Sequence, residues 1–160
     1  MDLTESRTVI HSTFAIERSF AASPERVFAA FADPAKKRLW YANGRSFEVV
    51  EFAMDFRVGG QDRTMYRFPE SSPFPGAPLL YETTYLDIVP ERRIVYAYTM
   101  SVGGKPVSIS LTTFELLPSL GGTELILTEQ GAYFEGSGGA EMREAGWRGL
   151  LDQLAESLAV

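Results

Sequence analysis

The C-terminal segment from Gly139 to Val160 constrains the fold most, because it combines helical spacing with one long apolar stripe. Its apolar side chains recur at steps of three and four residues, at Trp147, Leu150, Leu151, Leu154 and Leu158. This spacing places them on one side of an amphipathic helix, with Arg143, Arg148, Asp152 and Glu156 largely on the other side. A stripe headed by tryptophan needs a broad apolar surface to cover it, so the preceding chain must supply one.

The residues before this helix supply that surface, because their hydrophobicity alternates with the period of two that is typical of strands. Strands are expected at residues 8–20, 47–58, 61–68, 79–89, 92–102, 107–117 and 123–130. Gly59-Gly60, Pro90-Glu91 and Gly103-Gly104 provide turns, and Pro118 to Gly122 is expected to form a loop. On the first strand Ile10, Phe14 and Ile16 should share a face, and on the second Val50, Phe52, Met54 and Phe56 should do so.

Two short helices are expected between the first two strands. Ser23-Pro24-Glu25 gives an N-cap serine, a proline at the first helical position and an acid in the first turn. Asp33-Pro34 repeats this start signal, and the second helix should end near Leu39-Trp40. The order predicts an α+β fold in which a curved antiparallel sheet of about seven strands wraps around the long C-terminal helix. One helix is too narrow to fill such a sheet, so a cavity between helix and sheet is expected.

Composition narrows the class of protein. The chain has 160 residues, which predicts one domain over 1–160, and its net charge of −6 argues against a nucleic-acid partner. It has no cysteine, which excludes disulfides and thiol chemistry. No apolar run is long enough to insert into a membrane, and the N-terminus MDLTESRTVI lacks the basic start and apolar core of a signal peptide. A cytoplasmic location is therefore expected.

Several segments in this order resemble a known family. They are ASPERVFAAFADPAKKRLW (22–40), DFRVGG (55–60), YLDIVPERRIVYAY (85–98), GGTELILTEQG (121–131) and GW (146–147). The chain resembles the START/birch-pollen-allergen superfamily, SRPBCC, and within it the branch named after the activator of the Hsp90 ATPase. The resemblance implies the helix-grip fold. Family members often carry a histidine three residues before the GW, where this chain has Arg143. A pocket role of that histidine therefore does not transfer.

Aromatic residues from several expected elements are the first candidates for a ligand site. Tyrosine and tryptophan combine a large apolar body with one polar tip, which suits a hydrophobic or aromatic small molecule. The candidates are Trp40, Tyr85, Tyr96, Tyr98 and Trp147, with Tyr66 as a further aromatic residue, and ordinary core packing is the alternative for each of them.

Three further side chains could complete this site. Arg63, which shares a strand face with Arg67, could meet a ligand carboxylate or carbonyl if that face points inward, and is a solvated charge if it points outward. Glu129 ends the alternating run Leu125, Leu127, Glu129, so it lies either inside, where it needs partners, or at the wet end of the strand. Phe74, in the proline-rich loop 69–78, either caps the cavity mouth or packs outside the sheet as an anchor.

The residues support three classes of function. Binding of a hydrophobic or aromatic small molecule is favoured, the resemblance implies a possible chaperone partner, and a cyclase- or hydrolase-type enzyme is the less favoured class. No catalytic residue, metal site or cofactor is assigned, because the lone histidine, His11, stands on the first strand outside any motif. Gly146 either lets the helix approach the sheet closely or is a tolerated cost. The oligomeric state is left open.

Overall fold

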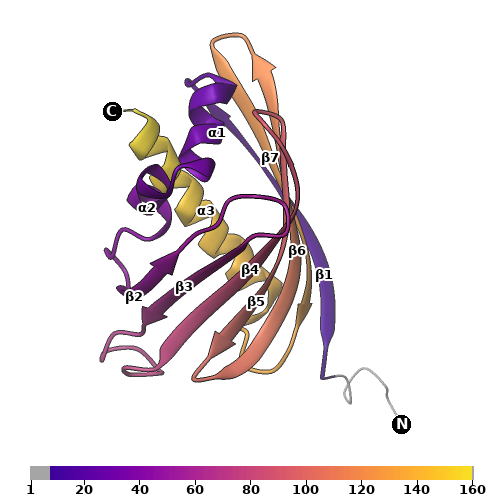
Figure 1. Ribbon diagram of the computed structural model, residues 1–160. Coiled ribbons are helices and arrows are strands. Elements are labelled where there is room, and N and C mark those ends of the chain that lie inside the picture. The colour runs from indigo at the N-terminus through magenta and orange to yellow at the C-terminus, as the bar shows by residue number, and fades with distance from the viewer. Residues whose placement is uncertain (1–7, 160) are drawn as a thin grey trace.

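The computed structural model describes residues 8–159, which form the predicted α+β helix-grip fold (Figure 1). A curved antiparallel sheet of seven strands has the order β1-β7-β6-β5-β4-β3-β2, so β1 and β2 are its edges. The strands are β1 (Ile10–Phe20), β2 (Glu48–Ala53), β3 (Gln61–Arg67), β4 (Pro78–Val89), β5 (Arg93–Val102), β6 (Lys105–Ser119) and β7 (Gly122–Tyr133). The helices are α1 (Pro24–Ala32), α2 (Pro34–Tyr41) and α3 (Gly139–Leu158), and all lie on the concave side of the sheet.

The two short helices start where their capping signals predict. The Ser23 hydroxyl accepts a hydrogen bond from the Arg26 amide at 3.3 Å and caps α1. The Asp33 carboxylate accepts from the amides of Ala35 at 2.9 Å and Lys36 at 3.4 Å and caps α2. Each helix has proline in its first turn, where the missing N–H has no helical partner to lose.

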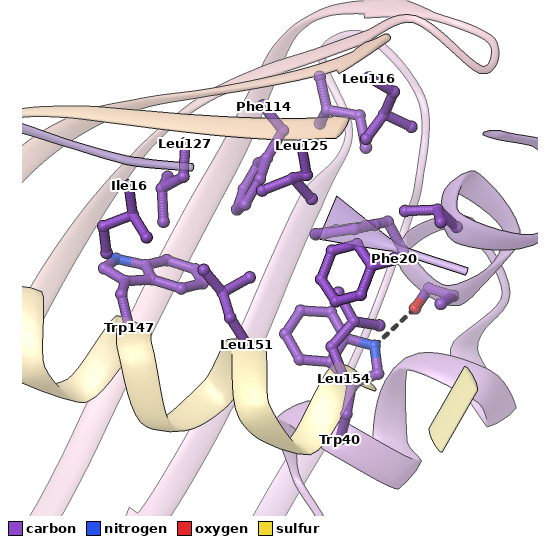
Figure 2. Packing of buried hydrophobic residues seen from close by; sticks show 14 of the residues in the cluster. Ile16, Phe20, Trp40, Phe114, Leu116, Leu125, Leu127, Trp147, Leu151 and Leu154 are labelled. Carbon is purple, nitrogen blue, oxygen red and sulfur yellow. Dashed lines mark hydrogen bonds between the residues drawn. The ribbon is translucent and has the colours of Figure 1, made fainter. Parts of the chain in front are cut away.

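Helix α3 buries the predicted stripe against one half of the sheet. Figure 2 shows Trp147, Leu151 and Leu154 pointing from α3 toward the apolar side chains of Ile16, Phe114, Leu125 and Leu127. Leu151 and Leu154 are fully buried, and each such side chain contributes about 1.5–3 kcal/mol of gross transfer free energy. The C-terminal end of α3 lies beside α1 (Figure 1), where Arg26 donates to the Leu158 carbonyl at 2.7 Å.

The position of Arg143 differs from the prediction. It was expected on the solvent side of α3, but it is only 9% exposed and lies on the inner side. The reason is geometric, because Arg143 is four residues before Trp147 and therefore one turn away on the same face. Its charge, rather than its spacing, was misleading.

Some strand boundaries also differ from the prediction. The expected loop from Pro118 to Gly122 is wrong, because β6 and β7 pair up to Ser119 and Gly122 and leave only a tight turn between them. The second strand stops at Ala53, and a bulge between Val49 and Glu51 interrupts its alternation, so Val50 is 45% exposed. Ile10 is also exposed, at the open end of β1.

The inner face of β6 is partly polar. Ser108, Ser110 and Thr112 are buried beneath α3, whereas Ile109 on the outer face is 50% exposed. An alternating strand with its small polar residues inside creates room for a buried polar cluster in the apolar core. No helix within residues 8–159 is long and apolar enough to cross a membrane.

Candidate functional site

A pocket of about 640 Å³ lies between α3 and the inner face of the β3, β4 and β5 half of the sheet. Among the described elements, α3 makes its main contacts with α1, α2, β1 and β7, so it packs less closely against the opposite half of the sheet. The sheet contributes Tyr66, Leu79, Tyr81, Thr83, Tyr96, Tyr98, Met100 and Val102 to the lining. Helix α3 contributes Met142, Arg143, Ala145, Gly146, Trp147, Gly149, Leu150 and Gln153. Tyr41 from α2, Phe47, Phe68 and Phe74 close the remaining sides.

Two glycines of α3 keep part of this pocket open. A Cβ atom built at Gly146 or Gly149 would meet no atom within 4 Å apart from its chain neighbours and the local helix backbone. Of the two alternatives for Gly146, a close approach of helix and sheet is therefore wrong, and a tolerated cost in helix stability is the one that remains. Each glycine costs about 1 kcal/mol of helix stability relative to alanine, and what both positions provide is open space.

Glu129 lies directly behind the pocket wall and is fully buried. Its Oε1 accepts hydrogen bonds from Tyr98 Oη at 2.9 Å and Trp147 Nε1 at 2.9 Å. Thr112 Oγ1 donates to the same oxygen at 3.0 Å, and Tyr133 Oη lies 3.4 Å from Oε2. Hydrogen bonds from these four donors offset the free-energy cost of removing the carboxylate from water.

Arg143 joins this cluster from α3. It donates from Nη1 to Tyr98 Oη at 2.7 Å and from Nη2 to Ser108 Oγ at 2.7 Å. Nη2 also lies 2.7 Å from Met100 Sδ, and Nη1 lies 3.8 Å from Glu129 Oε2. Burial lowers the pKa of this guanidinium, but Tyr98, Tyr81 and Glu129 outweigh burial and raise the pKa above its ordinary value. Arg143 therefore stays charged inside the wall.

The tyrosines of the pocket supply hydroxyl groups without charge. Burial is the main cause that raises the pKa of Tyr41, Tyr81, Tyr96 and Tyr98 above the ordinary value. These phenols consequently stay protonated at neutral pH and act as neutral hydrogen-bonding groups. Among the described residues that line the pocket, Arg143 is the only Arg, Lys, Asp or Glu.

The structure brings four of the predicted site residues together. Tyr96, Tyr98, Trp147 and Phe74 all line the pocket. Phe74 is 46% exposed, and its ring lies 5.5 Å from that of Phe68, so the loop side chain lies at the edge of the pocket rather than outside the sheet. Glu129 points inward, which is the first of its two predicted alternatives. It is connected to the pocket only through Tyr98, Trp147 and Arg143.

Three predicted residues lie elsewhere: Trp40, Arg63 and Tyr85. Trp40 belongs to the core, where its Nε1 donates to the Ala30 carbonyl at 2.9 Å, the dashed line of Figure 2. Arg63 lies on the outer face of the sheet and pairs with Glu51 at 3.0 Å and Glu82 at 3.2 Å. The outward alternative for Arg63 is the one that the structure contains, because β3 directs Asp62 and Thr64 inward instead.

Tyr85 also lies outside the pocket lining, in a second buried polar cluster. It donates to Asp62, and Lys37 Nζ lies 3.4 Å from both Tyr85 Oη and Asp62 Oδ2. Desolvation lowers the pKa of Lys37, and Asp62 opposes this shift. The cluster fastens α2 to the sheet next to Tyr41, whose ring centroid is 4.8 Å from Lys37 Nζ.

Sequence reasoning missed Arg143 and Tyr81 as pocket residues. Both had a usable signal, because Arg143 shares the helix face of Trp147, and Tyr81 shares a strand face with Leu79, Thr83 and Tyr85. His11 lines a shallow depression on the outer face of the sheet with Ile109 and Gln130, away from the pocket.

Comparisons with known proteins agree with this geometry. The family model described as "Activator of Hsp90 ATPase homolog 1-like protein" matches residues 21–159. A crystal structure of a Rhizobium loti protein is 48% identical, covers 95% of this chain and 100% of that chain, and has a TM-score of 0.84. An uncharacterized Rhizobium leguminosarum protein is 35% identical, with coverages of 94% and 96% and a TM-score of 0.87.

A more distant structure shares the fold. The solution structure of an AHSA1-like protein from Aeromonas hydrophila is 21% identical, with coverages of 92% and 92% and a TM-score of 0.68. A comparison with curated proteins gives no significant match. The family model extends from the end of β1 to the end of α3, and therefore includes every element that contributes to the pocket. The chain belongs to the Activator of Hsp90 ATPase homolog 1-like family, within the SRPBCC superfamily.

Proposed function

We propose that this protein binds a hydrophobic or aromatic small molecule in the pocket between α3 and the sheet. The observation that carries the proposal is the pocket itself. Its described lining combines tyrosine, phenylalanine, tryptophan, leucine and methionine side chains with one charged group. Its volume of about 640 Å³ is in the range that small-molecule sites occupy, and a mostly apolar lining with few polar groups is typical of such sites.

The free energy for this binding comes mainly from apolar burial. A ligand that removes about 200 Å² of its apolar surface from water gains roughly 5 kcal/mol gross at about 25 cal/mol per Å². Part of that gain offsets the lost freedom of the ligand. The pocket walls are held by α3 and by paired strands, so little further ordering of the protein is required for binding.

Filling the space beside Gly149 tests the proposal. A Gly149→Leu substitution places a side chain in open pocket volume, so the affinity for a fluorescent apolar naphthalene probe should fall at least about tenfold, equivalent to about 1.4 kcal/mol. The melting temperature should stay the same or rise, because leucine is the better helix former. Ala155→Leu, on an exposed position of α3 outside the pocket lining, is the matched control and should bind as the wild type does.

Two outcomes would contradict the proposal. One is a wild-type protein that does not bind apolar probes. The other is a Gly149→Leu variant that binds them with wild-type affinity, which would place the bound probe outside this pocket.

Fewer observations support the alternative functions. Regulation of a chaperone ATPase is suggested by the description of the family, and pull-down with the chaperone followed by an ATPase assay tests it. Cyclase- or hydrolase-type chemistry needs a positioned acid or base in contact with substrate, and turnover of ester or polyketide-like substrates tests that. The cytoplasmic location also stays a prediction.

A further inference from the structure

We propose that the polar end of the pocket selects an uncharged ligand with a carbonyl oxygen over a carboxylate of the same shape. This inference rests on the proposed function, since it names the ligand class for the same pocket. The residues that carry it are Arg143, which lines the pocket, and Glu129, which lies behind the wall.

Arg143 has hydrogen-bond donors that its protein partners do not all use. A guanidinium has five N–H donors. The described contacts use Nη1 for Tyr98 and Nη2 for Ser108 and Met100, and within residues 8–159 the Nε–H makes no hydrogen bond. A ligand oxygen that accepts from Arg143 therefore uses a donor that the described residues do not use, whereas a pure hydrocarbon offers that donor no acceptor.

Glu129 supplies the counter-charge of Arg143. Glu129 Oε2 is 3.8 Å from Arg143 Nη1, so the positive charge that Arg143 brings to the pocket wall is already balanced. Glu129 accepts its hydrogen bonds from Tyr98, Thr112 and Trp147, so the N–H donors of Arg143 are left for other acceptors. The pair is electroneutral without any ligand.

The charge of a ligand decides whether the Arg143–Glu129 pair stays balanced. A ligand carboxylate on Arg143 would give two negative charges around one positive charge in a desolvated wall, and burial of an unbalanced charge is costly. A ligand cation would face Arg143 directly. Among the described lining residues there is no second arginine or lysine to compensate an anion. A neutral carbonyl oxygen gains the hydrogen bond and leaves the charge balance unchanged.

A pair of fluorescent probes tests the inference on the wild-type protein. Both carry the same dimethylaminonaphthalene body, one with a propionyl ketone and the other with a carboxylate, and binding is titrated at neutral pH. The ketone should bind at least about tenfold more tightly, equivalent to about 1.4 kcal/mol. Equal affinities, or tighter binding of the carboxylate, would overturn the inference and leave the proposed function standing. Failure of both probes to bind would remove the proposed function and this inference with it.

Glu129→Gln separates charge balance from shape. The substitution leaves Arg143 without its counter-charge, so the affinity for the carboxylate probe should rise at least about tenfold and the ketone should lose its advantage. Glu124→Gln is the matched control, because it makes the same change in net charge on the same strand. Glu124 accepts a hydrogen bond from Ser19 Oγ and lies away from the pocket. An unchanged preference in a folded Glu129→Gln variant would overturn the role of Glu129.

Arg143→Met provides a second variant if Glu129→Gln does not fold. It removes the donor and leaves Glu129 negative, so the ketone should lose its advantage over dimethylaminonaphthalene without a carbonyl group, and the carboxylate should not bind. A ketone advantage that survives in Arg143→Met would show that another group donates the hydrogen bond to the carbonyl oxygen, and would overturn the assignment to Arg143.

Discussion

At the scale of single residues, Trp147 has two roles in one side chain. Its indole ring packs on Phe114 with centroids 5.5 Å apart, and its Nε1 donates to Glu129 at 2.9 Å. The ring therefore belongs to the core, whereas the N–H belongs to the polar cluster behind the pocket. The two roles can be separated by substitution.

Trp147→Ala should lower the free energy of unfolding by about 3–5 kcal/mol, because it leaves a large cavity. Trp147→Phe keeps an aromatic ring and removes one donor from a buried carboxylate, so it should cost less, about 1–3 kcal/mol. Chemical denaturation of both variants measures the two values. A Trp147→Ala variant within about 0.5 kcal/mol of wild type, as for an exposed side chain, would contradict the described packing of α3.

The sequence singled out members of the Glu129 cluster separately, but it did not predict that they contact one another. The alternation Leu125, Leu127, Glu129 left two positions open for the carboxylate, inside with the two leucines or at the wet end of the strand. Its partners come from β5, β6, β7 and α3, and strand register, which the sequence did not specify, decides which donors reach it. Arg143 had the right spacing, but a charged residue on an amphipathic helix is usually solvated.

At the scale of elements, the signals that depend on local chemistry were predictable. The caps of α1 and α2 start those helices because a side-chain oxygen next to an amide acts without help from the rest of the chain. The end of β6 was not predictable in this way, because pairing with β7 carries the strand through Pro118, at a position opposite Thr123. Tertiary hydrogen bonds override the local preference there.

The loop between β3 and β4 contains Phe74, the predicted cap of the pocket. Phe74 lies at the pocket edge between two prolines and is about half exposed. If it caps the entrance, Phe74→Ala should change the association and dissociation rates of an apolar probe in stopped-flow experiments and shift the free energy of unfolding by less than about 0.5 kcal/mol. Val58→Ala, at an exposed apolar residue outside the pocket lining, is the control and should leave both rates unchanged. Loss of stability with unchanged rates would instead make Phe74 an anchor.

At the scale of the whole molecule, the tyrosines share one property, a pKa raised above the ordinary value. The chain has seven tyrosines. The pKa is raised above the ordinary value of 10.0 for all of them, mainly because burial disfavours the phenolate: Tyr41, Tyr66, Tyr81, Tyr85, Tyr96, Tyr98 and Tyr133. For Tyr133 the pKa rises to about 12.

These shifts predict loss of stability in alkali. Above pH 10.0 the unfolded chain releases tyrosine protons that the folded chain retains, so the free energy of unfolding should fall as the pH rises beyond that value. The lowered pKa of Lys37 acts in the opposite direction below its ordinary value of 10.5, because the folded state binds fewer protons there. Tyrosinate absorbance and circular dichroism, followed together in one titration, measure the effect. Both signals should change in a single transition, and tyrosinate that forms near pH 10.0 in a folded protein would contradict the burial of these rings.

The separation of core and pocket along α3 has a consequence for the way such proteins diverge. One side of the helix is fixed by Leu151 and Leu154, which fill the core, while Gly146 and Gly149 border empty space. Substitution of either glycine would therefore change the shape of the pocket while Leu151 and Leu154 still maintain the core. Proteins that share this backbone can therefore differ in the shape of the pocket, and shared architecture alone does not identify the function of each one.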